Sequence, residues 1–321
     1  MKKFVLMVVA VLGFSFAQAQ SVVETYNEAS KAVQAKDFAK AAQLYETVIA
    51  EGSEEEDATI VGCVKNAKNN LPVMYVYMGK LAAGAATKLE DAEAKDAKFA
   101  EAIKALETAV AKAKSYRNTK AQATANTTIA QVYQTHGGGY FNSGDYAKAI
   151  EIFSKGYAAN NKNTDLAMML AESHFKSNNY AEGVKICSEV AALPSPKYDA
   201  AIAAAKAKMG LYTNNKIAEL QKANDFDGII AMSETIADKA LAQKVLVQAY
   251  FLKKDYAKVI EIGEAAAALQ TDDESKSAVY FNLGSAYNAK ENKAKAIECL
   301  NKVTVEPYAT PAKAAVAELS K

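Results

Sequence analysis

Apolar residues recur three and four positions apart along most of this 321-residue chain, and polar residues fill the positions between them. This spacing places apolar side chains on one face of an α-helix. Gly and Pro are scarce, with 15 and 5 occurrences, whereas Ala and Lys are abundant and lose little conformational entropy in a helix. The pattern predicts an all-α protein.

The expected helices follow one another in pairs. Tight breaks separate the two members of each pair, and longer breaks separate one pair from the next. The clearest pairs are residues 21–34 with 38–50, 165–176 with 180–193, 240–252 with 256–269, and 276–289 with 294–303. Thr310-Pro311 then begins a short final helix, because Thr is a good cap and Pro is accepted in a first helical turn.

Three stretches are harder to interpret. Pro72 interrupts the apolar pattern, so we expect one helix before it and another over residues 73–89. The helix expected over 119–135 runs into Gly137-Gly138-Gly139, and because each glycine costs about 1 kcal/mol in a helix, we expect it to fray or bend there. Residues 198–222 form either one helix or two helices divided near Thr213.

One short motif begins several of the second helices. The stretch 144–150 reads Gly-Asp-Tyr-Ala-Lys-Ala-Ile, and 36–42, 179–184 and 254–260 repeat its order of polar residue, aromatic residue, two spacers, small residue and aliphatic residue. This order predicts a tight turn followed by the first two turns of an amphipathic helix.

The motif has a measurable period. Ala149 and Gly183 occupy its small position and are 34 residues apart (183 minus 149), which is the tetratricopeptide period. The spacing of that family's signature is also followed, except at its Trp, by Tyr280, Leu283, Gly284, Tyr287, Ala296 and Leu300. The chain therefore resembles the tetratricopeptide repeat family over nearly all of its length after residue 19, with the best match in the last repeat and five to seven repeats in total.

The resemblance implies a right-handed superhelical solenoid of antiparallel helix pairs with a C-terminal capping helix. The strongest internal break, Pro194-Ser195-Pro196, divides it into residues 20–193 and 194–321, which we expect to form one continuous solenoid.

The first 19 residues have the features of a secretory signal peptide. Lys2 and Lys3 precede an apolar run over 4–16, and Ala17-Gln18-Ala19 supplies a small-x-small cleavage site. No Cys follows that site, so a lipid anchor is not expected, and the predicted location is periplasmic or secreted. The alternative is an uncleaved anchor or a buried helix, although the run is short for a bilayer.

The charge of the chain narrows the classes of partner that we expect. Cleavage would remove two Lys, leaving 36 basic residues (38 minus 2) against 37 acidic ones, with no basic cluster. This balance argues against nucleic acid and anionic membranes as partners.

Cys63, Cys187 and Cys299 each lie in an apolar helical pattern and are more than a hundred residues apart. We expect three buried small hydrophobic residues.

In the tetratricopeptide family the inner helices line a concave groove that commonly holds a peptide segment of a partner. The resemblance thus implies a groove for a peptide or protein here, lined by aromatic and amide side chains. The candidate residues are Phe141, Phe175, Phe251, Phe281, Lys244, Gln248, Asn282, Ser285 and Asn288. The alternative is that the Phe side chains pack between repeats. The family's carboxylate clamp would be at most partial, because no Arg accompanies Lys244.

Catalytic, cofactor and metal sites are not expected. His136 and His174 lie in neighbouring repeats but lack an evident third ligand, so packing or solvent roles are favoured over a metal site. Gly139 and Gly144 bracket four residues as a phosphate-binding loop would, but Asp145 and Tyr146 follow where Lys and Ser or Thr are required. No catalytic motif is present, and a non-enzyme is predicted.

The sequence therefore predicts a non-catalytic interaction scaffold, with assembly or maintenance of the bacterial cell envelope as its hypothetical setting. One alternative is a structural envelope module that assembles with itself. A less favoured alternative is an envelope hydrolase or its helical accessory domain. The pattern selects neither a specific partner nor an oligomeric state.

Overall fold

The computed structural model describes residues 20–236 and 238–321, and every regular element among them is an α-helix. The prediction of an all-α protein is confirmed. The predicted signal peptide, residues 1–19, lies outside the described residues. The chain divides into two compact units, and the boundary between them falls after Asn160. The division expected after residue 193 falls within the second unit, where α8 packs against α9, and the prediction of one continuous solenoid stays a prediction.

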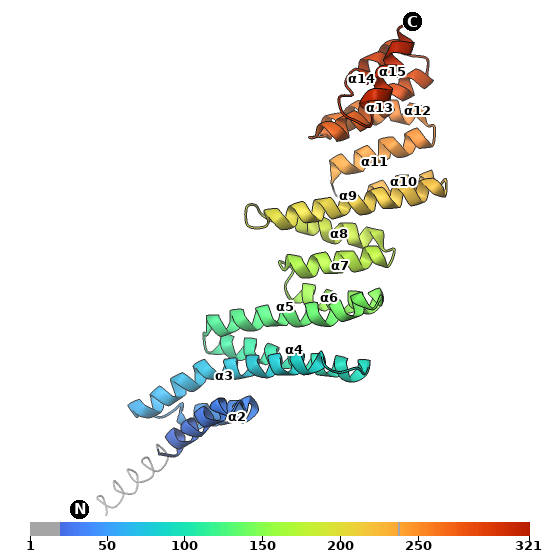
Figure 1. Cartoon of the computed structure of the whole chain (residues 1–321). Coiled ribbons are helices and arrows are strands. Elements are labelled where there is room, and N and C mark those ends of the chain that lie inside the picture. The colour runs from blue at the N-terminus through green and yellow to red at the C-terminus, as the bar shows by residue number, and fades with distance from the viewer. Residues whose placement is uncertain (1–19, 237) are drawn as a thin grey trace, which may run out of the picture. The chain divides into compact units, whose positions relative to one another are not determined.

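In the first unit each helix packs against the next along the chain (Figure 1). Residues 20–34 are helical. They are followed by α2 (Phe38–Gly52), α3 (Ala58–Ala86), α4 (Ala92–Ser115), α5 (Thr119–Asn142) and α6 (Tyr146–Ala159). Helix α3 also contacts α5, so first helices of successive pairs lie against each other as expected of stacked pairs.

The second unit repeats this arrangement of helices packed in sequence. It contains α7 (Thr164–Lys176), α8 (Tyr180–Ala191), α9 (Asp199–Lys222), α10 (Phe226–Glu234), α11 (Lys239–Leu252), α12 (Tyr256–Leu269), α13 (Asp273–Ala289), α14 (Lys293–Leu300) and α15 (Ala309–Leu319). First helices again contact each other, α7 with α9 and α11 with α13. Helix α15 packs on α14 as the expected terminal helix, with its buried Ala312 beside Leu300 and Val303 in one apolar cluster.

The repeated motif forms the turn that the sequence predicts. Gly144 adopts a positive φ of 84°, and the equivalent Lys36, Asn178 and Lys254 have φ values near 60°. The amide N–H of the next residue then bonds back across the turn, as Asp145 N does to the Tyr140 carbonyl oxygen at 3.0 Å. These are the backbone bonds of a Schellman motif, and they close the end of the first helix.

The same turn also begins the second helix. The Asp145 carboxylate accepts a hydrogen bond from Lys148 N at 3.0 Å, and Asp37 and Asp255 cap α2 and α12 in the same way. One of the unpaired amide groups at each helix start is thereby satisfied. A single short stretch of sequence therefore ends one helix and starts the next.

The small position of the motif lies at the contact between paired helices. Ala149 is fully buried, and a Cβ added to Gly183 would lie 2.6 Å from the Phe175 ring. Large residues at this position would push the two helices apart, because protein cores are close-packed.

Two expectations about helix boundaries are wrong. Helix α3 continues through Pro72 instead of breaking there. Proline removes one helical hydrogen bond, but Leu71 and Met74 are buried in one apolar cluster with residues of the two preceding helices, and this packing holds the helix together. The Asn118 side chain also donates a hydrogen bond to the Asn69 carbonyl oxygen at 2.9 Å.

The expectation of fraying at the three glycines is also wrong, because α5 continues to Asn142. Gly137 is buried against Phe153 of α6, and a Cβ added there would lie 2.5 Å from that ring. Close packing of α5 on α6 therefore requires a glycine at this position. Helix α9 is likewise one helix, because Thr213 is buried and its hydroxyl lies 2.5 Å from the Tyr180 hydroxyl.

The three cysteines are buried and free, as predicted. Burial raises the pKa of the Cys187 thiol to about 12 and that of Cys299 to about 11. At neutral pH both therefore remain protonated thiols, which are poor nucleophiles.

Candidate peptide-binding groove

Three first helices of the second unit, α9, α11 and α13, line a groove with a volume of about 430 Å³. Five of the nine residues predicted for the peptide site meet in it: Lys244, Gln248, Phe251, Phe281 and Asn282. The rest of its lining is Asn214, Ile217, Gln221, Leu252, Glu274, Ala278 and Tyr308.

Amide side chains supply the hydrogen-bonding capacity of the groove. Gln248 and Asn282 are half-buried, and no hydrogen bond joins either side chain to another group among the described residues. Each amide carries both donors and an acceptor. The two side chains are therefore available to a ligand's backbone.

Lys244 is the lysine of the groove, and Glu274 lines the same groove with an opposite charge. The Lys244 ammonium group donates to the Ser275 hydroxyl at 3.1 Å. Near this contact, the backbone hydrogen bond from Ser275 lowers the pKa of Asp272, and the Lys244 charge adds to the effect. Asp272 therefore stays ionised while it caps α13 through Ser275 N at 2.7 Å.

Aromatic side chains form the apolar part of the groove. Phe281 lies 5.6 Å from the Tyr308 ring centroid, and Phe251 lies 5.9 Å from that of Tyr256. Both Phe side chains remain half-buried after these contacts. Their remaining surface is the kind of amphipathic anchor that protein interfaces favour.

The other four predicted residues lie elsewhere. Ser285 and Asn288 lie further along α13 and do not line the groove. Phe141 belongs to the first unit, where it packs edge-on against Tyr146. Phe175 is 6% exposed, and its ring stacks on that of Tyr212 with centroids 4.1 Å apart. Phe175 therefore packs between repeats, which was the alternative to a role in the groove.

Asn214, Gln221 and Tyr308 were missed by the sequence reasoning. The first two lie on α9, whose continuity the sequence left open, and Tyr308 immediately precedes α15. A firm assignment of α9 as a single helix would have placed Asn214 and Gln221 on one face, because they are seven residues apart.

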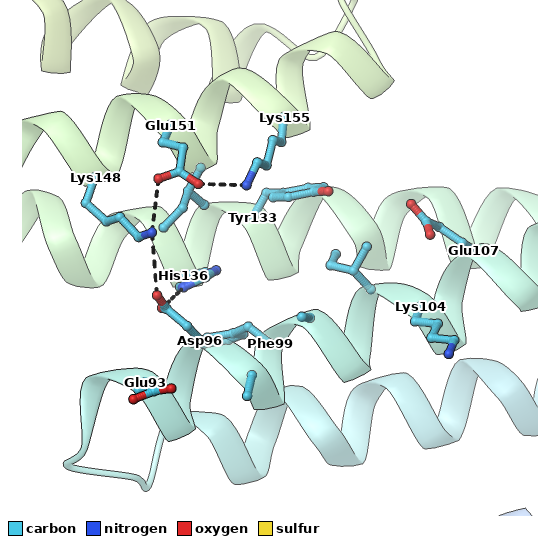
Figure 2. A pocket seen from close by; sticks show the side chains of 14 residues that line it. Glu93, Asp96, Phe99, Lys104, Glu107, Tyr133, His136, Lys148, Glu151 and Lys155 are labelled. Carbon is cyan, nitrogen blue, oxygen red and sulfur yellow. Dashed lines mark hydrogen bonds and ion pairs between the residues drawn. The ribbon is translucent and has the colours of Figure 1, made fainter.

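The first unit contains a second cavity, which no sequence pattern indicated. It measures about 510 Å³ and lies between α4 and α6 over α5 (Figure 2). Its lining is Glu93, Asp96, Ala97, Phe99, Ala100, Ile103, Lys104, Glu107, Tyr133, His136, Lys148, Glu151, Ile152 and Lys155.

A hydrogen-bonded cluster closes one end of this cavity (Figure 2). Asp96 Oδ1 lies 2.6 Å from His136 Nε2 and accepts a hydrogen bond from the Tyr140 hydroxyl at 2.9 Å. Desolvation raises the pKa of Asp96, but the hydrogen bonds from His136 and Tyr140 outweigh it and leave that pKa lowered. Burial dominates at His136 and lowers its pKa against the opposing effect of Asp96.

Glu151 holds two lysines at the upper edge of the cavity. Lys155 Nζ and Lys148 Nζ lie 2.8 and 3.0 Å from its carboxylate oxygens, and these bonds lower the pKa of Glu151 to about 2. Lys148 Nζ also lies 3.7 Å from Asp96 Oδ2. The positive charges of both lysines are therefore matched within the cluster.

The two histidines lie in different packing environments. His136 stacks on Phe99 with ring centroids 4.3 Å apart, whereas His174 Nδ1 is buried without a hydrogen-bond partner. Within the part of the chain that the structure describes, no group of three His, Cys, Asp or Glu side chains is placed to share a metal ion. Over the same residues, none of the helices combines the length and apolar character needed to cross a bilayer.

Comparison with known proteins agrees with the helix-pair arrangement. A family model described as tetratricopeptide repeat matches residues 140–209. No curated protein sequence matches the chain.

Solved structures with similar folds include tetratricopeptide repeat domains. The P58(IPK) TPR domain is 11% identical, with 94% of this chain and 97% of that chain covered and a TM-score of 0.31. A tetratricopeptide repeat protein from Parabacteroides merdae ATCC 43184 is 12% identical over 94% and 100%, with a TM-score of 0.23. The TPR2AB domain of yeast Sti1 in its pHSP90 complex is 13% identical over 87% and 98%, with a TM-score of 0.20. The resemblance to the tetratricopeptide repeat family is thus supported by a family model over residues 140–209, which includes the motif at Gly144 and the pair α7–α8.

Proposed function

We propose that this protein is a non-catalytic scaffold that binds a peptide segment of a protein partner in the groove between α9, α11 and α13. The observation that carries the proposal is the convergence of Lys244, Gln248, Phe251, Phe281 and Asn282 on one groove. These residues come from two helices that are about thirty positions apart in sequence. They meet because successive first helices stack.

The groove offers the contacts that an extended or helical peptide needs. Half-buried amides can pair with the polar groups of a peptide backbone, and the two Phe side chains can hold its apolar side chains. Lys244 can pair with a carboxylate of the segment, but only as a single charge, because no arginine fork accompanies it and Glu274 adds an opposite charge to the same groove.

The proposal also covers the cellular location of the protein and the kind of partner found there. The basic, apolar and small-x-small order of residues 1–19 supports export, with the periplasm or the exterior as the destination. A partner in the bacterial cell envelope is then the natural candidate. Self-assembly into a structural module is the competing hypothesis.

The proposal is tested by capture from envelope extract. The chain beginning at Gln20 is immobilised beside a variant with Phe251→Ala and Phe281→Ala, and captured proteins are quantified by mass spectrometry. Loss of an anchoring aromatic costs about 2 kcal/mol or more, so at least one protein should be captured roughly thirtyfold less by the variant.

A matched control is Phe141→Ala, which removes a half-buried Phe of the first unit. Its captured set should equal that of the parent. Equal capture by the groove variant and the parent would contradict the proposal. Capture of only the chain itself would favour self-assembly.

A further inference from the structure

The cavity in the first unit lies between the second helices of two pairs, whereas the groove lies between first helices. It is bordered by α4 and α6, the second members of two successive pairs, and α5 forms its floor (Figure 2). Its volume of about 510 Å³ exceeds that of a single large side chain. This site is therefore separate from the proposed groove in residues and in location along the chain.

At one end of the cavity every charge is paired except that of the exposed Glu93. Glu151 is bonded to both Lys148 and Lys155, and Asp96 is bonded to His136 and Tyr140. An anionic ligand would have to compete with Glu151 for both lysines. An anion is consequently disfavoured at this end.

The opposite end has an unmatched negative charge. Glu107 is exposed, and among the described residues it takes part in no ion pair. Figure 2 shows its carboxylate directed toward Tyr133, while the Lys104 ammonium points away from the cavity. Burial raises the pKa of Tyr133, the charge of Glu107 raises it further, and the charge of Lys155 lowers it, so both charged groups lie near this ring.

The lining as a whole carries one more carboxylate than lysine. Four carboxylates (Glu93, Asp96, Glu107, Glu151) and three lysines (Lys104, Lys148, Lys155) give a net charge of −1 with His136 neutral. The carboxylates without an ion pair are Glu93 at one end and Glu107 at the other.

Between the two ends the wall is apolar. Phe99 and Ile152 are buried, and Ile103 is half-buried beside them. Such a wall suits a methylene stem, and an aromatic face with an adjacent carboxylate suits the cation at the end of that stem.

We propose that this cavity binds an arginine or lysine side chain of a basic peptide, with the stem against Phe99 and Ile103 and the cation between Tyr133 and Glu107. The peptide's neighbouring apolar side chains would fill the remaining volume beside Ile152. The partner is thus a basic, apolar segment of another protein, bound independently of the groove in the second unit.

The proposal is tested by NMR on the chain from Gln20 with labelled isoleucine methyl groups. The probes are the capped tripeptides Leu-Arg-Leu, Leu-citrulline-Leu and Leu-Glu-Leu, of which citrulline is a neutral analogue of arginine. Leu-Arg-Leu should shift the Ile103 and Ile152 signals saturably, and the other two probes should shift them less at equal concentration. Ile217, which lines the groove of the second unit, serves as an internal reference.

Glu107→Gln should weaken Leu-Arg-Leu binding by about threefold, since it removes one exposed charge. The matched control Glu90→Gln removes an exposed carboxylate that does not line the cavity, and binding should be unchanged. Equal binding of the arginine and citrulline probes, stronger binding of the glutamate probe, or shifts confined to Ile217 would each overturn the proposal. These outcomes leave the capture experiment on the groove unaffected.

Discussion

At the scale of single residues, the two histidines are the side chains whose charge responds most to a change of pH near neutrality. They are the only histidines in the chain, and burial lowers the pKa of each. At His136 the charge of Asp96 opposes this effect, while Lys148 and Lys155 add to it. At His174 burial is likewise opposed by Glu182 and supported by Lys185.

The sign of the pH dependence follows from these shifts. A histidine whose pKa is lower in the folded state binds its proton more readily in the unfolded chain. Its contribution to stability is therefore complete above the unfolded pKa of about 6.5 and is lost as the pH falls through the folded value. The carboxylates with resolved shifts all have lowered pKa values and titrate at lower pH.

We predict that the melting temperature falls between pH 7.5 and pH 5.5. In a double variant with His136→Gln and His174→Gln, the melting temperature should hardly change between these two pH values, whatever the absolute stability of the variant. The slope of melting temperature against pH is thus the quantity to compare. Thermal melts followed by circular dichroism at the two pH values measure the slope. An unchanged slope in the double variant would assign the pH dependence to other groups.

At the scale of elements, α5 shows how packing overrides helix propensity. Its three consecutive glycines lie in a continuous helix, but their surroundings differ. Gly137 lies against the buried Phe153 ring, whereas a Cβ added to Gly138 or Gly139 would meet nothing within 4 Å. Only the first glycine has a packing reason to be there.

Replacing Gly138 and Gly137 by alanine should therefore have opposite effects. Gly138→Ala should stabilise the protein by about 0.5–1 kcal/mol, because alanine loses less backbone entropy in a helix. Gly137→Ala gains the same propensity but forces Phe153 to move, and overpacking of this kind costs about 1–3 kcal/mol. Urea unfolding of the two variants gives both values. If the two substitutions changed the free energy of unfolding equally, α5 and α6 would be able to move apart without loss of stability.

The elements could be predicted wherever local sequence decides the structure. The turn at Gly144 and its repeats, the pairing of helices and the terminal helix α15 were all predictable, because a positive φ, an Asp cap and apolar spacing are local properties. The continuity of α3 through Pro72 was not predictable, because it depends on burial of Leu71 and Met74 against residues far along the chain.

The site was predictable to a similar extent. Five groove residues follow from the resemblance to the tetratricopeptide repeat family, whose inner helices line a groove. The cavity beside Tyr133 depends on the space left between α4 and α6, which no pattern within either helix reveals.

At the scale of the whole molecule, charge limits the class of partner. Removal of residues 1–19 would leave 36 basic and 37 acidic residues. Ion pairs join many of them across one helical turn, as Lys258 with Glu261 and Lys295 with Glu298 do. Such exposed pairs add little stability, but they place an acidic group beside each of these lysines, so we expect little clustered positive charge.

The chain from Gln20 should therefore pass through a heparin column at low ionic strength without retention. Binding to a polyanion requires clustered lysines and weakens with added salt. Retention of the chain at about 50 mM salt, followed by elution in a salt gradient, would contradict this prediction, because it would show that the chain has a basic surface. A basic control protein of similar size shows that the column is active.

The turn at Gly144 has a further consequence for how the chain folds. Its backbone bond joins Asp145 to Tyr140, and the equivalent bonds at Asp37, Asn179 and Asp255 also span five residues. Closing so short a loop costs little entropy, so each helix pair can form before distant parts of the chain meet. We expect folding to start at any of several turns and to spread to neighbouring pairs, so that no single region acts as an obligatory nucleus.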